Sequence, residues 1–224
     1  MAMSRRGFLG WTVGAIVMRP PLTRIVPSAR CVILDLGTAC CLPESIAGYE
    51  TALGAGVVRT DMWSVPRSAT LIVPATVDVP LLAVRAMQTC LEGGGMVILE
   101  SGAGFSSQRD FHAHRAALRD AFDLEVDKPI SLWLDSTARG APYVDFTWPI
   151  STKIRDFSRV VPQRTGAGTI IAQVNGLPVA RVQRRRRGTL IMLGTPIGPA
   201  LWAGDAEARR WLQAVAGTWE ALSN

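Results

Sequence analysis

The chain has 224 residues, 48% of them hydrophobic, and a mean hydropathy of +0.21. That length fits one domain with a sizeable core, or one domain preceded by a leader. Four of the positive charges, on Arg5, Arg6, Arg19 and Arg24, fall within residues 1–29, so the formal +6 less these four leaves +2 for the rest. The basic character is therefore weak support for nucleic-acid binding, and no nucleic-acid partner is expected.

Residues 1–29 are predicted to be an export leader and linker. An apolar segment runs from Phe8 to Met18, which is shorter than the ~20 apolar residues of a membrane span and typical of a secretory signal. It follows Ser4-Arg5-Arg6-Gly7-Phe8-Leu9, which resembles the twin-arginine export motif. We therefore expect a periplasmic or secreted protein, with an inner-membrane tether if the leader is not cleaved.

Four cysteines, Cys31, Cys40, Cys41 and Cys90, would meet an oxidising compartment. They show no CxxC spacing and no neighbouring histidine, so no metal site is expected, and we expect no cofactor. A disulfide or a buried thiol is favoured over a reactive thiol at Cys40 and Cys41. The connectivity of the four cysteines stays open.

From residue 30 onward, predicted strands and helices alternate. Strands are predicted at 30–35, 57–63, 69–74 and 96–100, and helices at 43–53, 79–91 and from Ser106 or Ser107 to about 122. This alternation is typical of a mostly parallel sheet with helices on both faces. We therefore expect one α/β domain of flavodoxin-like type over residues 30–224.

A different pattern begins at Asp123. Short aromatic-rich strands are predicted at 130–134 and 143–148, and their aromatic side chains (Trp133, Tyr143, Phe146 and Trp148) are expected to pack rather than to stack on sugars. Asn175-Gly176 lies between predicted strands at 169–174 and 178–183, and this dipeptide favours a two-residue hairpin. A second turn, Arg184 to Gly188, leads into a strand at 189–193, and a final helix starts at Asp205.

The run Arg184 to Arg187 places four like charges in that second turn. A solvated turn is the simplest interpretation. The alternative is a contact with anionic lipid headgroups or acidic polymers.

The strongest site signal is the stretch Gly93 to Phe105, with the sequence GGGMVILESGAGF. Three glycines end a predicted helix, an apolar run predicts a buried strand, and small residues follow it. In open α/β sheets this carboxyl edge is where ligands bind and where a nucleophile elbow lies. Glu100, Ser101 and Gly102 are therefore candidate ligand-binding residues, together with Asp35 at the end of the first predicted strand.

Each acidic candidate has two interpretations. Glu100 either binds a cation, a sugar hydroxyl or an amine, or accepts hydrogen bonds from the elbow amides. Asp35 either joins Glu100 in a carboxylate pair suited to acid/base work or caps an exposed turn. Ser101 is a weaker nucleophile candidate, because Leu99 stands where GxSxG requires glycine.

These features resemble the class I glutamine amidotransferase-like superfamily, in particular its biotin-ligase N-terminal-like and trehalose-utilisation-like branches. The resemblance covers roughly residues 30–222 and rests on the strand order, the glycine-strand-elbow unit and the late hairpin leading to Gly194-Thr195-Pro196. It implies that the catalytic Cys-x-Gly falls on Glu100-Ser101-Gly102 and the histidine-x-glutamate pair on Thr195-Pro196-Ile197. The triad is then absent, and Thr195 becomes a further ligand-binding candidate.

The resemblance also implies that no base activates Ser101. The histidines of the chain, His112 and His114, fall in the helix after the elbow and are expected to point away from it. The leading hypothesis is therefore an exported pseudoenzyme, a non-catalytic domain that binds a small ligand or protein partner at the elbow crevice. The alternatives are a periplasmic hydrolase using Glu100 and Asp35 on a glycan or peptide, and a structural assembly subunit, with homo-oligomerisation left open.

Overall fold

The computed structural model describes residues 31–40, 42–60, 65–67, 69–132, 143–157 and 159–223. The predicted leader, Cys41, Trp133 and the end of the second predicted strand lie outside the described residues. Export and tethering therefore stay predictions, and the connectivity of the four cysteines stays open. Among the described helices, none combines the length and the apolar character that a membrane crossing requires.

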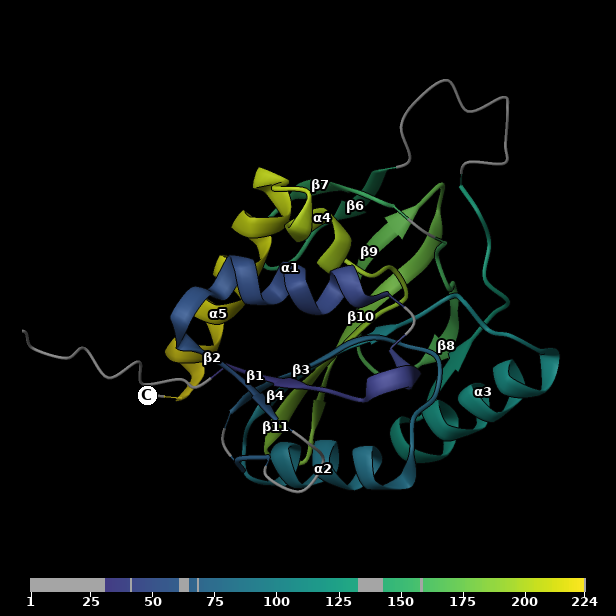
Figure 1. Cartoon of the computed structure of the whole chain (residues 1–224), viewed down its shortest axis with the longest axis horizontal. Coiled ribbons are helices and arrows are strands. Elements are labelled where there is room, and N and C mark those ends of the chain that lie inside the picture. Colours follow the sequence, from purple (N-terminus) through teal and green to yellow (C-terminus); the bar gives the residue numbers. More distant parts are fainter. Residues whose placement is uncertain are drawn as a thin grey trace, which may run out of the picture.

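Two kinds of strand pairing build one mixed sheet at the centre of the domain (Figure 1). The parallel strands are β1 (Cys31–Leu34), β2 (Val57–Thr60), β3 (Thr70–Thr76), β4 (Met96–Ser101) and β11 (Gly188–Leu193). The antiparallel strands are β6 (Tyr143–Phe146), β7 (Thr152–Arg155), β9 (Thr169–Val174) and β10 (Leu177–Arg185). The strand order is β2-β1-β3-β4-β11-β10-β9-β6-β7.

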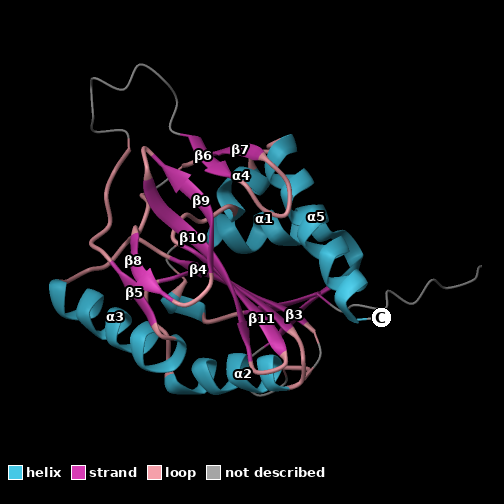
Figure 2. Ribbon diagram, turned by 180° about the vertical axis from the view of Figure 1, so that it is seen from behind, coloured by secondary structure: helices cyan, strands magenta, loops and turns pink. Residues whose placement is uncertain are grey.

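Helices cover both faces of this sheet, as Figures 1 and 2 show. One face carries α1 (Pro43–Leu53), α4 (Gly198–Trp202) and α5 (Ala206–Ser223), and the other carries α2 (Leu81–Glu92) and α3 (Gln108–Phe122). In β4, Ile98 belongs to the first core and Val97 and Leu99 to the second, because successive strand residues point to opposite faces. The predicted α/β class is therefore confirmed, but the sheet between the helices is mixed, with a parallel half and an antiparallel half rather than mostly parallel strands.

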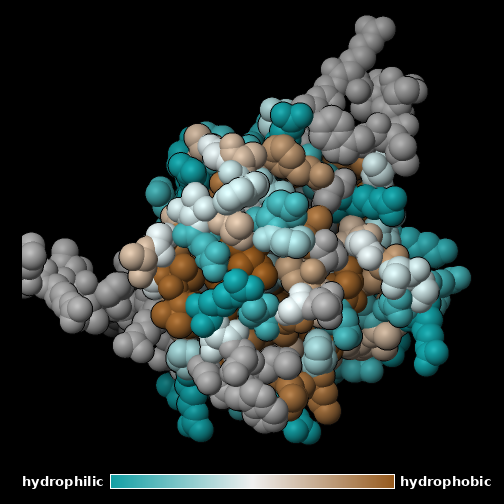
Figure 3. All heavy atoms as spheres, in the orientation of Figure 1, coloured by the Kyte–Doolittle hydropathy of each residue, from teal (hydrophilic) through white to brown (hydrophobic). Residues whose placement is uncertain are grey.

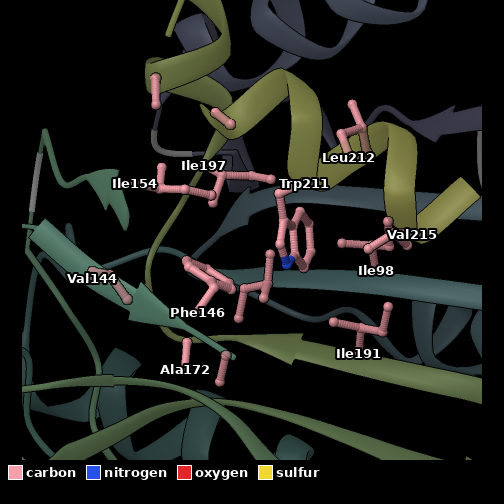
Figure 4. Close-up of a cluster of buried hydrophobic side chains, with 14 of the residues drawn as sticks. Ile98, Val144, Phe146, Ile154, Ala172, Ile191, Ile197, Trp211, Leu212 and Val215 are labelled. Atoms are coloured by element: carbon pink, nitrogen blue, oxygen red, sulfur yellow. The ribbon is translucent and has the colours of Figure 1, made fainter. Parts of the chain in front are cut away.

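The core beneath α5 contains part of the predicted aromatic cluster (Figure 4). The rings of Trp211 and Phe146 lie 5.1 Å apart, and Trp211 Nε1 donates to the carbonyl oxygen of Trp148 at 2.8 Å. Phe146 is buried, whereas Tyr143 is 45% exposed. The prediction that these side chains pack is confirmed for Phe146, and for Trp148, which is partly buried against the same core.

The predicted hairpin joins β9 to β10, with Asn175 and Gly176 at φ of 49° and 78°. These are the left-handed angles that a two-residue hairpin turn requires. The strand predicted at 130–134 is wrong over its described residues, where the only pairing is an isolated bridge between Ile130 and Val160. A separate small sheet of β5 (Leu124–Val126) and β8 (Gln163–Gly166) was not predicted.

Two glycines bring α1 and α4 into backbone contact. A Cβ atom added at Gly48 would lie 1.9 Å from the carbonyl oxygen of Gly198, and one added at Gly198 would lie 2.3 Å from the Cα of Ser45. Neither position has room for a side chain. This close approach places the start of α4 and one face of α1 over the carboxyl end of β4.

Candidate functional site

Glu100 lies near the carboxyl end of β4 and is completely buried. Its Oε1 accepts from the Tyr49 hydroxyl at 2.8 Å and from the amides of Ile197 and Gly198 at 2.8 and 3.2 Å. Its Oε2 accepts from the Ala75 amide at 3.0 Å and the Ser45 hydroxyl at 3.2 Å. The carboxylate therefore holds α1, β3 and the turn before α4 onto the end of β4.

Burial raises the pKa of Glu100, and the donors around its two oxygens oppose that rise because they favour the charged form. The pKa of Tyr49 is also raised, by burial first and by the neighbouring Glu100 charge second, so its hydroxyl stays a proton donor. Glu100 therefore does accept backbone hydrogen bonds, as one interpretation expected, but they come from Ala75, Ile197 and Gly198 rather than from the elbow amides.

The backbone at Ala75 is adapted to this carboxylate. Ala75 has a φ of 31°, in a region that side chains rarely adopt, and the pairing of β3 with β4 shifts register between Val73 and Thr76. Such an irregularity re-aims a backbone group. Here it leaves the Ala75 amide directed at Glu100 Oε2.

Asp35 is not brought to Glu100. Its Oδ2 lies 2.7 Å from Arg59 Nη2, and its Oδ1 accepts from the amide of Gly37 at 2.8 Å, in a partly exposed position. Because β3 lies between β1 and β4, the two carboxylates belong to non-adjacent strands with separate partners. The capping interpretation of Asp35 fits these contacts, and the carboxylate pair does not.

Thr195 and Gly102 also have structural partners. The buried Thr195 hydroxyl donates to Asp156 Oδ1 at 3.2 Å. The Gly102 amide donates to the carbonyl oxygen of Thr76 at 2.6 Å, which ties the loop after β4 to the end of β3. Neither residue lines the pocket described below.

Ser101 faces the opposite side of β4 from Glu100 and meets His114 of α3. Ser101 Oγ lies 2.8 Å from His114 Nε2, and both side chains are buried. The expectation that both histidines point away from the elbow is therefore wrong for His114. Periodicity placed His114 correctly on the helix, but the rotation of α3 about its axis was misjudged.

The Ser101–His114 pair lacks what nucleophilic catalysis needs. Burial lowers the pKa of His114 to about 4, and its Nδ1 has no hydrogen-bond partner among the described residues. A serine nucleophile requires a base oriented by a third group and a path for the substrate. Ser101 is 0% exposed, so the pair joins α3 to β4 rather than presenting a hydroxyl to a substrate.

A pocket of about 320 Å³ opens next to the elbow, at the loop between β4 and α3. The described residues that line it are Ala103, Phe105, Ser107, Gln108, Phe111, Lys128, Pro129 and Arg159. Phe105 lies 5.2 Å from Phe111 and 5.1 Å from His114, measured between ring centroids. The pocket thus combines an aromatic wall with hydroxyl, amide and cationic groups, and no carboxylate is among its described lining residues.

Part of this pocket has a signal in the sequence. Ser107 was predicted to cap the next helix, and its hydroxyl does accept from the Asp110 amide at 3.1 Å. Lys128, Pro129 and Arg159 lie in irregular segments without hydrophobic periodicity, and only the fold brings them to the mouth of the elbow.

No family model and no curated protein matches this chain. Among solved structures, it is similar to a β-galactosidase from Rahnella sp. R3, with a TM-score of 0.63, 14% identity, and coverage of 86% of this chain and 31% of that one. An exo-β-1,4-mannosidase from Opitutaceae bacterium strain TAV5 has a TM-score of 0.57 and 11% identity over 84% of this chain and 36% of the enzyme. The chain thus spans about a third of the length of these glycosidases.

A third similar structure has a matching length. It is a cytoplasmic protein from Salmonella typhimurium LT2, with a TM-score of 0.52 and 11% identity over 84% of this chain and 98% of that one. Identities this low show likeness of fold alone.

The resemblance to the class I glutamine amidotransferase-like superfamily is corrected by these comparisons, and so is the pseudoenzyme interpretation that depended on it. No family model matches, and the similar structures described above are two glycosidases and the Salmonella protein. The reason lies in the motif itself. A glycine-rich turn, a buried strand and small residues at the carboxyl edge are required by any parallel α/β sheet, so they specify no single family.

Proposed function

We propose that this chain is a glycan-directed domain that binds a sugar in the pocket beside the elbow. The observation that carries the proposal is the pocket of about 320 Å³ with Phe105 in its wall and Gln108, Lys128 and Arg159 around it. A sugar presents apolar C–H faces and a ring of hydroxyls. A half-buried aromatic ring suits the first and amide or cationic donors suit the second.

The position of the pocket supports the proposal. Ligands of open α/β sheets bind outside the carboxyl ends of the parallel strands, and the loop from Gly102 to Ser107 leaves that edge at β4. The parallel half of this sheet has the order β2-β1-β3-β4-β11, and we propose that it is flavodoxin-like, because that order matches the flavodoxin arrangement. Several of the similar structures are named as glycosidases, which are enzymes that act on glycans, and this also supports the proposal.

Titration calorimetry of the full chain with galactose, mannose and fucose oligosaccharides and with a uronic-acid oligosaccharide tests this proposal. Phe105→Ala is expected to weaken binding at least tenfold, a loss typical of an aromatic contact in a buried site. Trp202→Ala is the matched control, since Trp202 is a 56% exposed aromatic on α4, away from the pocket. Equal losses in the two variants, or no sugar binding by the unmodified chain, would reject the sugar site.

A glycan hydrolase is the second candidate, and the glycosidase structures favour it. Glycosidic cleavage uses two accessible carboxyl groups about 5 to 9.5 Å apart. The buried Glu100 and the ion-paired Asp35 do not supply such a pair, so hydrolysis would depend on other carboxylates. Release of 4-nitrophenol from 4-nitrophenyl glycosides would support this candidate. If Glu100→Gln and Asp35→Asn retain that activity, the catalytic residues are carboxylates other than these two.

An assembly role is a third candidate, because two apolar side chains in the antiparallel half of the sheet are exposed. Tyr143 on β6 is 45% exposed and Leu177 on β10 is 42% exposed. On the face drawn in Figure 3, apolar side chains form several areas interrupted by hydrophilic ones, rather than one continuous surface. A sedimentation measurement that shows a monomer at high concentration would count against self-assembly.

A further inference from the structure

A second cavity, of about 340 Å³, lies at the other end of the parallel strands from the sugar pocket. Its walls are the carboxyl-terminal turns of α2 and α3, the end of β10 and the turn that follows it. The lining residues are Gln88, Leu91, Glu92, Ala121, Phe122, Arg184, Arg185 and Arg186. The two cavities occupy opposite ends of α3, a helix of 15 residues, which at 1.5 Å per residue separates them by roughly 20 Å.

The backbone of the β10–β11 turn is strained in a way that keeps an arginine in the cavity wall. Arg186 has a φ of 56°, in the left-handed region, which costs most residues more than it costs glycine, which has no Cβ, or asparagine, whose short side chain hydrogen-bonds locally. The neighbouring β9–β10 turn uses Asn175 and Gly176 for the same angles. Strain of this kind concentrates at functional positions, which makes Arg186 a residue to test.

The surrounding contacts hold this turn in place. Arg184 Nη1 donates to the Thr189 hydroxyl at 3.1 Å across the hairpin. Gln183 Nε2 donates to the carbonyl oxygen of Phe122 at 3.2 Å, which fastens β10 to the end of α3. The hairpin backbone that carries the arginines is therefore held in place, which lowers the cost of ordering it around a ligand.

The charge of the cavity indicates the ligand class. Arg184, Arg185 and Arg186 contribute three positive charges and Glu92 one negative charge, so the lining carries a formal +2. A phosphomonoester carries −1.5 to −2 at neutral pH and offers three acceptor oxygens, which matches guanidinium forks better than a carboxylate does. Glu92 and Gln88, one turn apart on α2, suit hydroxyl groups on the body of such a molecule.

We propose that this cavity binds the phosphate group of a hydroxyl-bearing phosphomonoester. The proposal does not depend on sugar binding at the elbow, because the two sites share only the helix α3. The same phosphate chemistry has two sources, a small soluble ester and the headgroup of a phosphomonoester lipid.

Calorimetric titration of the full chain with inorganic phosphate and with glycerol 3-phosphate tests the proposal, and flotation with phosphatidylcholine vesicles containing phosphatidic acid tests the lipid source. Arg185→Gln is expected to weaken binding about tenfold. Arg187→Gln is the matched control, because it removes the same charge from the same turn outside the cavity lining, and it is expected to change affinity less than twofold. Binding to the soluble phosphate probes would identify a small ester as the ligand, and binding to the vesicles alone would identify a lipid headgroup. Both outcomes support the phosphate site.

Arg186→Gly separates binding from folding. It relieves the strained angle, so the melting temperature is expected to rise by about 2 to 4 °C, while phosphate affinity falls about tenfold as in Arg185→Gln. A loss of affinity in a more stable variant cannot come from unfolding. Equal losses for Arg185→Gln and Arg187→Gln would mean diffuse charge attraction and overturn the proposal, as would the absence of binding to all of the phosphate probes.

Discussion

The substitution Glu100→Gln tests whether the elbow carboxylate is a structural cross-link. The variant keeps the size of the side chain but replaces one oxygen by an NH₂ group. The NH₂ group is itself a donor, and in either orientation it faces another donor. The Ile197 and Gly198 amides point at the position of Oε1, and the Ala75 amide points at the position of Oε2. The cheaper orientation places NH₂ toward Ala75, since the Ser45 hydroxyl beside it can reverse its role and accept.

The cost then has three parts. One buried amide, at Ala75, loses its acceptor, which costs about 1 to 3 kcal/mol. The remaining bonds to the side chain lose charge assistance, at up to about 1 kcal/mol each. Burial raises the pKa of the Glu100 carboxyl, so removing its buried charge is favourable and offsets part of this loss of stability. We expect a net destabilisation of about 2 kcal/mol, and a melting temperature about 4 to 8 °C lower.

Urea unfolding at pH 7 measures this difference, with an unchanged m-value showing that the folded and unfolded states stay comparable. The pH dependence gives an independent check. Because the folded pKa of Glu100 lies above 4.5, the unfolded chain ionises first as pH rises, and the contribution of Glu100 to stability falls from about pH 4.5 up to its folded pKa. That decline should be absent in Glu100→Gln. A variant as stable as the parent, or more so, would refute the cross-link and return Glu100 to the list of functional candidates.

Two further substitutions test the packing around the elbow. Burial lowers the pKa of His114 from 6.5 to about 4 in the folded protein, so the free energy of unfolding should fall by roughly 3 kcal/mol as pH drops from about 6.5 to 4. His114→Gln should remove this pH dependence in unfolding experiments at pH 4 and 7, and an unchanged dependence would assign it to other groups. Gly48→Ala should lower the free energy of unfolding by about 1 to 3 kcal/mol, because the new Cβ meets the Gly198 carbonyl. Gly56→Ala is the control and should be nearly neutral, because a Cβ there meets nothing within 4 Å. Equal effects of the two substitutions would mean that the α1–α4 contact is not tight.

The sequence was sufficient for the parallel half of the fold, where local signals agree. The helix predicted at 43–53 matches α1 at both ends, and the apolar run from Met96 matches β4. β4 is buried on both faces, so its hydrophobic pattern is dense, and glycine or proline marks the ends of both elements. The short strands β5, β7 and β8 have only 3 or 4 residues each, too few to show a period.

The roles of the elbow residues were beyond the sequence because their partners are remote in the chain. The contacts of Glu100 with Tyr49 and Gly198 span 51 and 98 residues. Nothing in the local pattern says that a helix of five residues, α4, would present its first amides to this carboxylate. The elbow was therefore located correctly, whereas the division of its residues between stability and recognition depended on the fold.

That division follows from the alternation of side chains along β4, and it leads to a last prediction. Glu100 faces α1 and α4, whereas Ser101 faces α3 and reaches His114. The loop that lines the proposed sugar pocket begins directly after Ser101, and Phe105 in that loop packs on the His114 ring. A change at His114 should therefore disturb the pocket, and a change at Glu100 should not.

Sugar affinity measured by calorimetry at pH 7, in variants that are still folded at the assay temperature, checks this separation. His114→Ala should weaken binding severalfold because the Phe105 ring loses the surface that supports it. Glu100→Gln should bind as the parent does, although it is the less stable protein. The opposite ranking would mean that the ligand enters from the α1 side of the sheet, and that the buried carboxylate opens to receive it.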